Sequence, residues 1–169
     1  MGMHNNIGKN IFYEEAMRVP FLISYGKQLV PRMDDELLFS LEDFCPTVLS
    51  LMGFQQEIPA SVQTRDLSEQ IRGSRKKMPS SQLYMFYGAV NETGKNLTTG
   101  ARGVRTLQYT YAIRYKDGVV TEEHLYDRNA DPFQLDNIAG KHPELVKPLR
   151  EELKQRMEAV QDPALSVLK

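Results

Sequence analysis

Residues 103–126 decide the fold and read GVRTLQYTYAIRYKDGVVTEEHLY. Between residues 103 and 115 polar side chains alternate with apolar or aromatic ones, which is the period of a strand that buries one face. Residues 116–118, Lys-Asp-Gly, supply a tight hairpin turn, and a second strand is predicted at residues 119–126. Residues 82–87 add another run of strand-forming residues, so these segments together predict an antiparallel sheet.

A helix is predicted after the sheet, from about residue 143 to residue 160. Apolar residues recur there at four-residue intervals and form one stripe, made of Leu145, Leu149, Leu153 and Met157. A helix with one apolar stripe buries that stripe against a partner. We therefore expect this helix to cover one face of the sheet.

The first half of the chain predicts different elements: a buried strand, a helix and connecting structure. Residues 18–26 form a compact apolar run bounded by proline and glycine, which indicates a buried strand covered on both faces. Residues 42–53 predict a capped, largely buried helix, because acidic residues precede it, a proline lies near its first turn and a glycine follows its end. Residues 54–79 are more polar and predict connecting structure.

Composition narrows the possible functions. The 169 residues carry a formal net charge of −1, which gives no general attraction to nucleic acid or to an anionic membrane. Aromatic residues in the predicted strands are explained by sheet packing. Cys45 is the only cysteine, which excludes an internal disulfide and a cysteine-built zinc site. No apolar run is long enough to cross a bilayer and no signal peptide is recognised, so the sequence assigns no compartment.

Three ordered stretches carry motifs beyond these periodic patterns. They are Gly8-Lys9 with Tyr13-Glu14-Glu15 and Arg18-Val19-Pro20, then Asp43-Phe44-Cys45-Pro46-Thr47, then Leu125-Tyr126-Asp127 with Asp131-Pro132 and Asn137. They resemble sulfatases of the alkaline-phosphatase superfamily over nearly the whole chain. The resemblance implies an α/β (α+β) fold, namely the C-terminal portion of the alkaline-phosphatase-like sulfatase fold, ending in a small four-stranded antiparallel sheet packed against a C-terminal helix.

The resemblance also implies how the chain is divided and what it lacks. Residues 1–78 would form the C-terminal edge of the family's large α/β domain, and residues 79–169 the smaller sheet-and-helix subdomain. The family's nucleophile is a cysteine or serine, oxidised to formylglycine, within Cys/Ser-x-Pro-x-Arg. Cys45 does not fit, because Pro46 follows it directly. We therefore expect the N-terminal catalytic half to be absent, and no cofactor in this chain, although a full-length relative would hold calcium or magnesium.

By this resemblance, Lys9 and His4 are the candidate catalytic residues. Sulfate transfer places negative charge on the nonbridging oxygens and on the leaving alcohol, so a cation fixed in place beforehand stabilises that charge. Lys9 fits this role, since Gly8 lets the loop approach a ligand closely. His4 could protonate the leaving group or contact the substrate. The ordinary alternatives are a solvated lysine and an exposed loop histidine.

Other charged residues support weaker hypotheses. Glu14, Glu15 and Arg18 are expected to form a partly buried ion pair that orients the chain at the predicted strand, which makes Arg18 structural rather than catalytic. Arg102 and Arg105 lie where the family's substrate pocket could be approached. No pair of histidines has the spacing of metal ligands, so this chain predicts no metal site.

Two functions remain open. In the first, the chain is part of a sulfatase that hydrolyses sulfate esters of a small molecule or glycan, and it is inactive alone. In the second, its sheet and helix form a noncatalytic binding or assembly module. Neither function involves nucleic acid or a membrane. The apolar strand predicted at residues 21–24 would expose an unpaired edge, which predicts a homo-oligomer.

Overall fold

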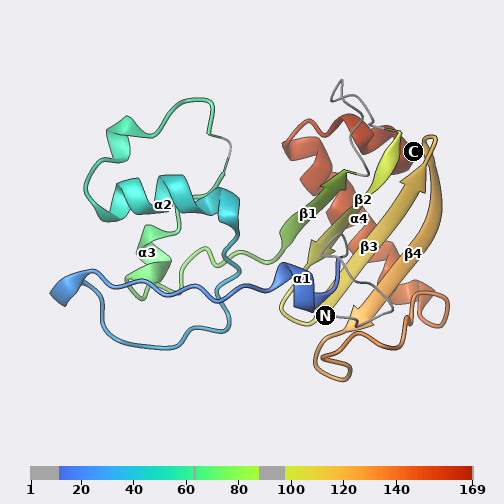
Figure 1. The fold of residues 1–169 in the computed structure, drawn as a ribbon, viewed down its shortest axis with the longest axis horizontal. Coiled ribbons are helices and arrows are strands. Elements are labelled where there is room, and N and C mark those ends of the chain that lie inside the picture. Colours follow the sequence, from blue (N-terminus) through green and yellow to red (C-terminus); the bar gives the residue numbers. More distant parts are fainter. Residues whose placement is uncertain (1–11, 63, 88–97, 169) are drawn as a thin grey trace. The chain divides into compact units, whose positions relative to one another are not determined.

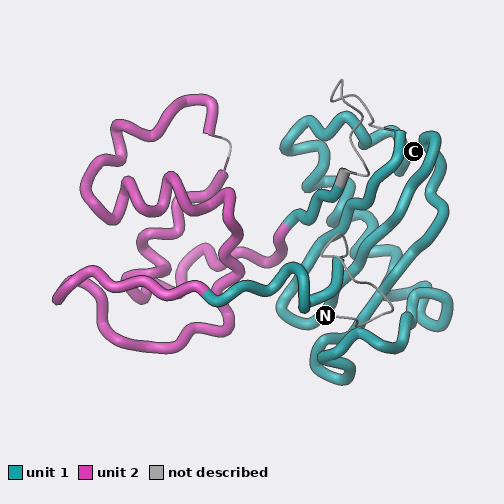
Figure 2. The backbone as a smooth tube through the Cα atoms, in the orientation of Figure 1, with its two compact units in different colours: residues 1–20, 83–169 teal, residues 21–82 magenta. Residues whose placement is uncertain are grey.

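Two compact units are distinguished within the chain (Figure 2). The computed structural model describes residues 12–62, 64–87 and 98–168. The sheet unit joins residues 1–20 to residues 83–169, and the helical unit comprises residues 21–82. The described residues 12–20 therefore belong with the C-terminal half of the chain and not with the residues that follow them.

The sheet unit contains four strands in the order β1-β2-β3-β4 (Figure 1). Their bounds are Gln82–Tyr87 for β1, Thr99–Arg105 for β2, Tyr109–Lys116 for β3 and Val119–Asp127 for β4. The pairs β2-β3 and β3-β4 are antiparallel, which confirms the predicted antiparallel sheet and hairpin. Asp117 and Gly118 have positive φ angles of 53° and 78°, as the tight turns that match strand twist require.

The strand predicted at residues 103–115 is wrong in one respect, because a turn at residues 106–108 divides it. Thr106 closes this turn. Its backbone N–H donates to the Tyr109 carbonyl over 2.8 Å, and its hydroxyl oxygen accepts from the Tyr109 N–H over 2.8 Å. Periodicity did not reveal the turn, since the intervening residues continue the alternation of the strands on either side. β2 and β3 are therefore two arms of a hairpin.

One face of the sheet is covered by α4, Pro143–Ala159, and by the 3-10 helix η5, Pro163–Leu168. In Figure 1 α4 runs behind the strands. The core on this face contains Tyr111, Ile113 and Leu125 from the sheet and Leu153 and Met157 from α4, all fully buried. The predicted helix and its contact with the sheet are confirmed. None of the described helices is both long and apolar enough to cross a membrane.

The opposite face of the sheet carries residues 12–17, which include α1, Glu14–Met17. Successive side chains of a strand point to opposite faces, so Ala112 lies on the other side from its neighbours in the α4 core. Phe12 packs there with Ala101, Ala112 and Tyr126. The sheet is thus covered on both faces by segments of its own unit.

Short helices make up the helical unit. They are η2 at Gly26–Gln28, η3 at Leu41–Asp43, α2 at Phe44–Leu51, η4 at Gln55–Glu57 and α3 at Ser68–Ile71. The helix predicted at residues 42–53 is confirmed by η3 and α2 together. The buried Asp43 carboxylate accepts from Arg65 Nη2 over 2.6 Å and also from the Ser40 backbone N–H over 3.1 Å. Asp43 therefore caps the helix start and ties it to the connecting segment.

The strand predicted at residues 18–26 is wrong. The structure assigns no strand there, and Val19 and Leu22 are 72% and 95% exposed. A strand covered on both faces needs neighbouring strands to take up its backbone hydrogen bonds and cover its side chains. Among the described residues, the sheet consists of β1 to β4 and offers this run no such neighbour.

Candidate functional site

The candidate residues Lys9 and His4 lie outside the described residues. The first described residue is Phe12, three positions after Lys9. The structure therefore shows how the chain that continues from the Lys9 motif is attached to the sheet, at Phe12 and at Glu14.

The Phe12 ring packs against two small residues of the sheet, Ala101 and Ala112. Only 1% of its surface is exposed, and the two alanines beneath it leave room for the ring. The His124 ring centroid lies 4.7 Å from that of Phe12, and the Arg114 guanidinium carbon lies 5.3 Å from the Phe12 centroid. This contact combines apolar burial with a cation–π interaction.

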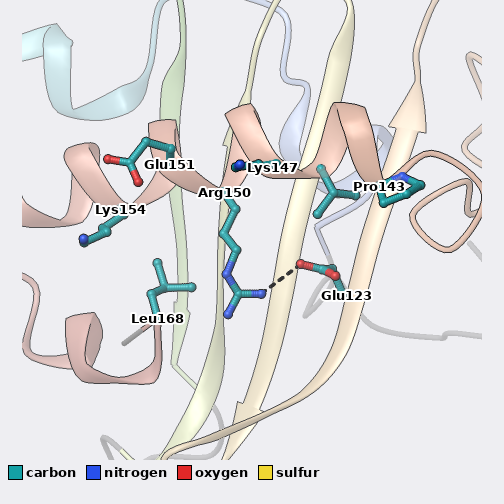
Figure 3. Close-up of a pocket in the computed structure, with 8 residues that line it drawn as sticks. Glu123, Pro143, Lys147, Arg150, Glu151, Lys154 and Leu168 are labelled. Atoms are coloured by element: carbon teal, nitrogen blue, oxygen red, sulfur yellow. Dashed lines mark hydrogen bonds and ion pairs between the residues drawn. The ribbon is translucent and has the colours of Figure 1, made fainter.

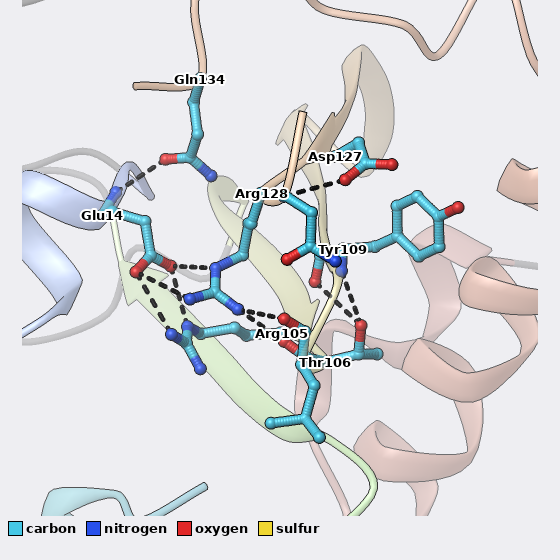
Figure 4. A network of polar contacts seen from close by, with 9 residues as sticks. Glu14, Arg105, Thr106, Tyr109, Asp127, Arg128 and Gln134 are labelled. Atoms are coloured by element: carbon cyan, nitrogen blue, oxygen red, sulfur yellow. Dashed lines mark hydrogen bonds and ion pairs between the residues drawn. The ribbon is translucent and has the colours of Figure 1, made fainter. Parts of the chain in front are cut away.

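Glu14 is held by two arginines from distant parts of the sheet unit (Figure 4). Arg105 donates from Nε to Oε1 over 2.8 Å and from Nη2 to Oε2 over 3.2 Å. Arg128 donates from Nε to Oε1 over 3.0 Å. The three side chains are only 11% to 16% exposed. Both carboxylate oxygens are thus engaged by charged donors, which makes these hydrogen bonds stronger than neutral ones.

Gln134 completes this arrangement from the opposite side. Its Oε1 accepts from the Glu14 backbone N–H over 2.7 Å, at the first residue of α1. Gln134 is 1% exposed and has a positive φ of 55°. Among the described residues, its buried Nε2 has no hydrogen-bond partner. We refer to Glu14, Arg105, Arg128 and Gln134 as the Glu14 clamp.

The turn that divides the predicted strand supports the clamp. Arg128 Nη1 donates to the Thr106 carbonyl over 3.2 Å and to the Leu107 carbonyl over 2.5 Å. The Arg128 backbone N–H also donates to the Gln108 carbonyl over 2.7 Å. The turn at residues 106–108 therefore presents carbonyl oxygens that a continuous strand would have used for pairing, and these orient the Arg128 guanidinium.

The clamp keeps its carboxylate charged. Burial alone would raise the pKa of Glu14, but the hydrogen bonds and positive charges of Arg105 and Arg128 outweigh burial and hold this pKa below its ordinary value. Burial, together with the nearby charge of Arg105, lowers the pKa of Arg128. Glu14 is therefore ionised at neutral pH, as a buried ion pair requires.

The expected partner of Glu14 is corrected by this geometry. Arg18 was expected from its nearness in the sequence, whereas the partners are Arg105 and Arg128, 91 and 114 residues away. The only signal in the sequence was that an acidic residue in a partly buried segment needs a cation. The arrangement of the strands decides which arginine lies close enough to pair with Glu14.

The expectation that Arg102 approaches a substrate pocket is wrong. Arg102 and Asp162 are both fully buried, and Arg102 donates from Nε to Oδ2 over 2.5 Å and from Nη2 to Oδ1 over 3.1 Å. The Arg102 guanidinium also lies over the Tyr115 ring at 5.6 Å. Arg102 therefore ties β2 to the residue before η5, while Arg105 belongs to the Glu14 clamp.

A separate hollow of about 340 Å³ lies on the α4 side of the sheet unit (Figure 3). Its lining includes Glu123, Val146, Lys147, Arg150, Lys154 and Leu168. Glu123 accepts from Arg150 Nη1 over 3.1 Å and from the Tyr111 hydroxyl over 2.5 Å. Burial and the Glu123 carboxylate raise the pKa of Tyr111, which stays a donor. The polar groups of Glu123, Arg150 and Tyr111 at this hollow therefore already hydrogen-bond to one another.

The part of the chain that the structure describes holds no group of three or more His, Cys, Asp or Glu side chains placed to bind a metal ion. The buried carboxylates of Glu14 and Asp43 are paired with arginines instead. They do not fit a calcium or magnesium site, and we assign no chemical step through a metal to these residues.

A four-stranded antiparallel sheet closed by a C-terminal helix is the C-terminal architecture of alkaline-phosphatase-like sulfatases, as similar solved structures show. Residues 2–163 match the family model for the C-terminal region of N-sulphoglucosamine sulphohydrolase. The chain belongs to this sulfatase family.

Individual relatives agree with this assignment. An endo-4-O-sulfatase of Bacteroides thetaiotaomicron is 32% identical over 92% of this chain and 32% of its own length. A solved Bacteroides fragilis protein assigned as a sulfatase is 40% identical with a TM-score of 0.89, covering 100% of this chain and 35% of its own. A third, from work on glycosaminoglycan metabolism by B. thetaiotaomicron, is 29% identical with a TM-score of 0.70, covering 82% and 30%. The chain thus spans about a third of these proteins.

Proposed function

We propose that this chain acts as the C-terminal region of a sulfatase that hydrolyses sulfate esters, and that it is inactive alone. The carrying observation is the family match over residues 2–163 together with a structural match that covers all of this chain and only 35% of the similar protein. The formylglycine nucleophile and the calcium or magnesium ion would belong to polypeptide outside these 169 residues.

In this proposal Lys9 and His4 act on the leaving side of the ester. The Lys9 ammonium would lie against the sulfate and the leaving oxygen, where its charge stabilises the transition state more than the ground state. His4 would protonate the leaving alcohol or contact the substrate. The support is the Gly8-Lys9 motif and its described continuation, which is fixed to the sheet at Phe12 and Glu14.

The substrate class we propose is a sulfated glycan. The support is the endo-4-O-sulfatase among the relatives and the structure from work on glycosaminoglycan metabolism. Isothermal titration of the purified chain with a sulfated glycan tests whether these residues contribute to recognition. We expect weak binding that the Lys9→Ala substitution reduces, whereas tight binding unchanged by Lys9→Ala would favour a noncatalytic module.

The main proposal is tested by activity and by the adjoining gene sequence. We expect no turnover of a chromogenic sulfate ester by the purified chain, and turnover that survived repurification would contradict the proposal. We also expect the DNA upstream of Met1 to encode, in frame, a Cys/Ser-x-Pro-x-Arg motif. Upstream DNA without that motif would favour the alternative function, a noncatalytic module.

A homo-oligomer is proposed for the chain alone, formed through apolar surfaces that the absent half of a sulfatase would otherwise cover. Within the helical unit Leu22, Val30 and Met33 are 95%, 75% and 93% exposed, which is unusual for large apolar side chains. We propose that these side chains are covered by a second copy in a homo-oligomer. Light scattering at increasing concentration tests this, since a stable monomer would contradict the homo-oligomer.

A further inference from the structure

We infer that the hollow beside α4 binds the sulfate groups of a glycan, at a second site apart from the one where the ester is hydrolysed. The inference takes its ligand class from the proposed function and assigns part of the recognition to described residues. Three side chains of α4 supply the positive charge, namely Lys147, Arg150 and Lys154 (Figure 3). The described residues that line the hollow all belong to the sheet unit.

The charges of α4 lie in two separate stripes. Successive residues of an α-helix are rotated by about 100°, so Lys147, Arg150 and Lys154 lie within about 60° of one another and span about 10 Å of the helix axis. The acidic residues at positions 144, 151 and 158 lie within about 40° of one another, in the stripe beside them. All three cations line the hollow, whereas only Glu151 of the acidic stripe does. The basic stripe therefore faces the hollow.

The two lysines are not neutralised within the described part of the chain. Glu151 follows Lys147 by four positions and precedes Lys154 by three, which are spacings at which ion pairs form on a helix. Even so, no ion pair or hydrogen bond joins either lysine side chain to another described residue. Glu151 accepts instead from Gln155 Nε2 over 3.3 Å. The charge of both lysines is therefore left for a ligand.

Arg150 is oriented by residues of the sheet. Its Nη1 donates to Glu123 Oε1 over 3.1 Å, and the same oxygen accepts from the Tyr111 hydroxyl over 2.5 Å. Because Tyr111 is fully buried, these contacts tie the guanidinium to the core of the sheet unit. A guanidinium carries five N–H donors, and the pair with Glu123 uses only part of them. The remaining donors suit the oxygens of a sulfate group.

The rest of the lining favours a sugar that carries sulfate groups. Pro143, Val146 and Leu168 contribute apolar surface. A sugar ring has C–H groups on its faces and sulfate groups at its edge, so its face can pack on this surface while its edge meets the cations. The volume of about 340 Å³ lies at the lower end of the range for small-ligand pockets, which suits a short part of a glycan.

The charge balance sets the expected strength and selectivity. Three cations and two carboxylates line the hollow, which leaves a formal charge of +1. We therefore expect weak binding that falls as salt is added. The acidic stripe next to the hollow would repel a long and uniformly charged polyanion such as duplex DNA. A sulfated oligosaccharide, with separate charges on a compact ring, avoids that repulsion.

Nuclear magnetic resonance of the full 169-residue chain tests this site. A chondroitin 4-sulfate hexasaccharide is titrated at low salt into the isotopically labelled chain that carries Lys9→Ala, so that the proposed role of Lys9 does not contribute. We expect the largest saturable shift changes at the backbone amides of residues 144–154. The desulfated hexasaccharide should bind there at least about tenfold more weakly, because it lacks the sulfate groups.

Two double variants in the same chain remove equal charge from different places. Lys147→Gln with Lys154→Gln is expected to weaken the binding by about tenfold or more. Lys27→Gln with Lys76→Gln is the matched control at exposed positions of the helical unit, and we expect less than about a twofold change. Arg150→Lys keeps the charge without the fork, so we expect a loss of about threefold.

Equal affinities of the two double variants would overturn the inference, as would shift changes that leave residues 144–154 unaffected. Desulfated hexasaccharide, inorganic sulfate or duplex DNA that bound as tightly as the sulfated sugar would overturn it too, because the hollow would then recognise charge alone. Restoring Lys9 separates this inference from the proposed function. An affinity that does not rise when Lys9 is restored would count against the role of Lys9, whereas the result at the hollow is measured without that lysine.

Discussion

The sheet unit and the helical unit treat their apolar residues in opposite ways. In the sheet unit the alternating residues of β3 and the stripe of α4 meet in one core, where Ile113 and Leu153 are fully buried. In the helical unit large apolar side chains such as Leu22 and Met33 remain exposed. A hydrophobic pattern therefore shows that a segment needs a covering surface, and it does not show that its own chain supplies one.

The buried ion pair of the sheet unit is where the largest effect is expected. Arg102→Gln leaves the Asp162 carboxylate buried without its cation, which destabilises by about 3–5 kcal/mol. Hydrogen exchange of the slowest β2 and β3 amides measures this loss. Lys141→Gln is the control in the same unit, because its ion pair with Asp136 is exposed, with Lys141 at 61% and Asp136 at 63%, and we expect less than about 1 kcal/mol. A loss for Arg102→Gln as small as the control's would contradict the buried pair.

The next prediction compares one leucine from each unit. Leu153→Ala removes a fully buried side chain from the α4 core and is expected to cost about 2–5 kcal/mol. Leu22→Ala removes a side chain that is 95% exposed in the single chain, so at concentrations where the chain is a monomer we expect a change within about 0.5 kcal/mol. Urea unfolding followed by circular dichroism measures both. Equal losses of stability in the two variants would mean that Leu22 is buried, as in an oligomer. The two units would then differ less in how far their apolar side chains are buried.

Within the helical unit, Asp43 is expected to matter more than any exposed apolar residue. Asp43→Ala removes the carboxylate that caps the helix and binds Arg65, so we expect a local loss of about 1–3 kcal/mol. Hydrogen exchange of the α2 amides detects it. Glu42→Ala is the control, since this neighbour is exposed. Similar exchange in the two variants would show that the fork to Arg65 contributes little.

The smallest effect concerns pH and the Glu14 clamp. The pKa of Glu14 is held below its ordinary value of 4.5, so its contribution to stability is present above that value and is lost as the pH falls through the lower folded pKa. We therefore expect the α1 amides to exchange a few-fold faster, after correction for intrinsic rates, as acid is added below about pH 4.5. Glu14→Gln should abolish this dependence, and a wild-type profile as flat as that of the variant would contradict it.

Part of the candidate site was readable from the sequence, and part was not. Lys9 and His4 come from a motif, and they remain predictions because they lie outside the described residues. The clamp that holds the following segment could not be read, since Gln134 shows no pattern and Arg105 was assigned to a different role. An acidic residue at position 14 implied a cation, yet the local candidate Arg18 was not the one that the fold supplied.

The sequence by itself determined the features that depend on near neighbours. The β3-β4 hairpin follows from alternation and from Asp117-Gly118, and α4 follows from its apolar stripe. The tertiary structure decided the break at Thr106, the exposure of residues 18–26 and the partners of Glu14 and Arg102. Turn and helix patterns depend on residues that lie close together in the sequence. Partners 60 or more residues apart, as for Arg102 and Asp162, are chosen only when the strands and helices come together.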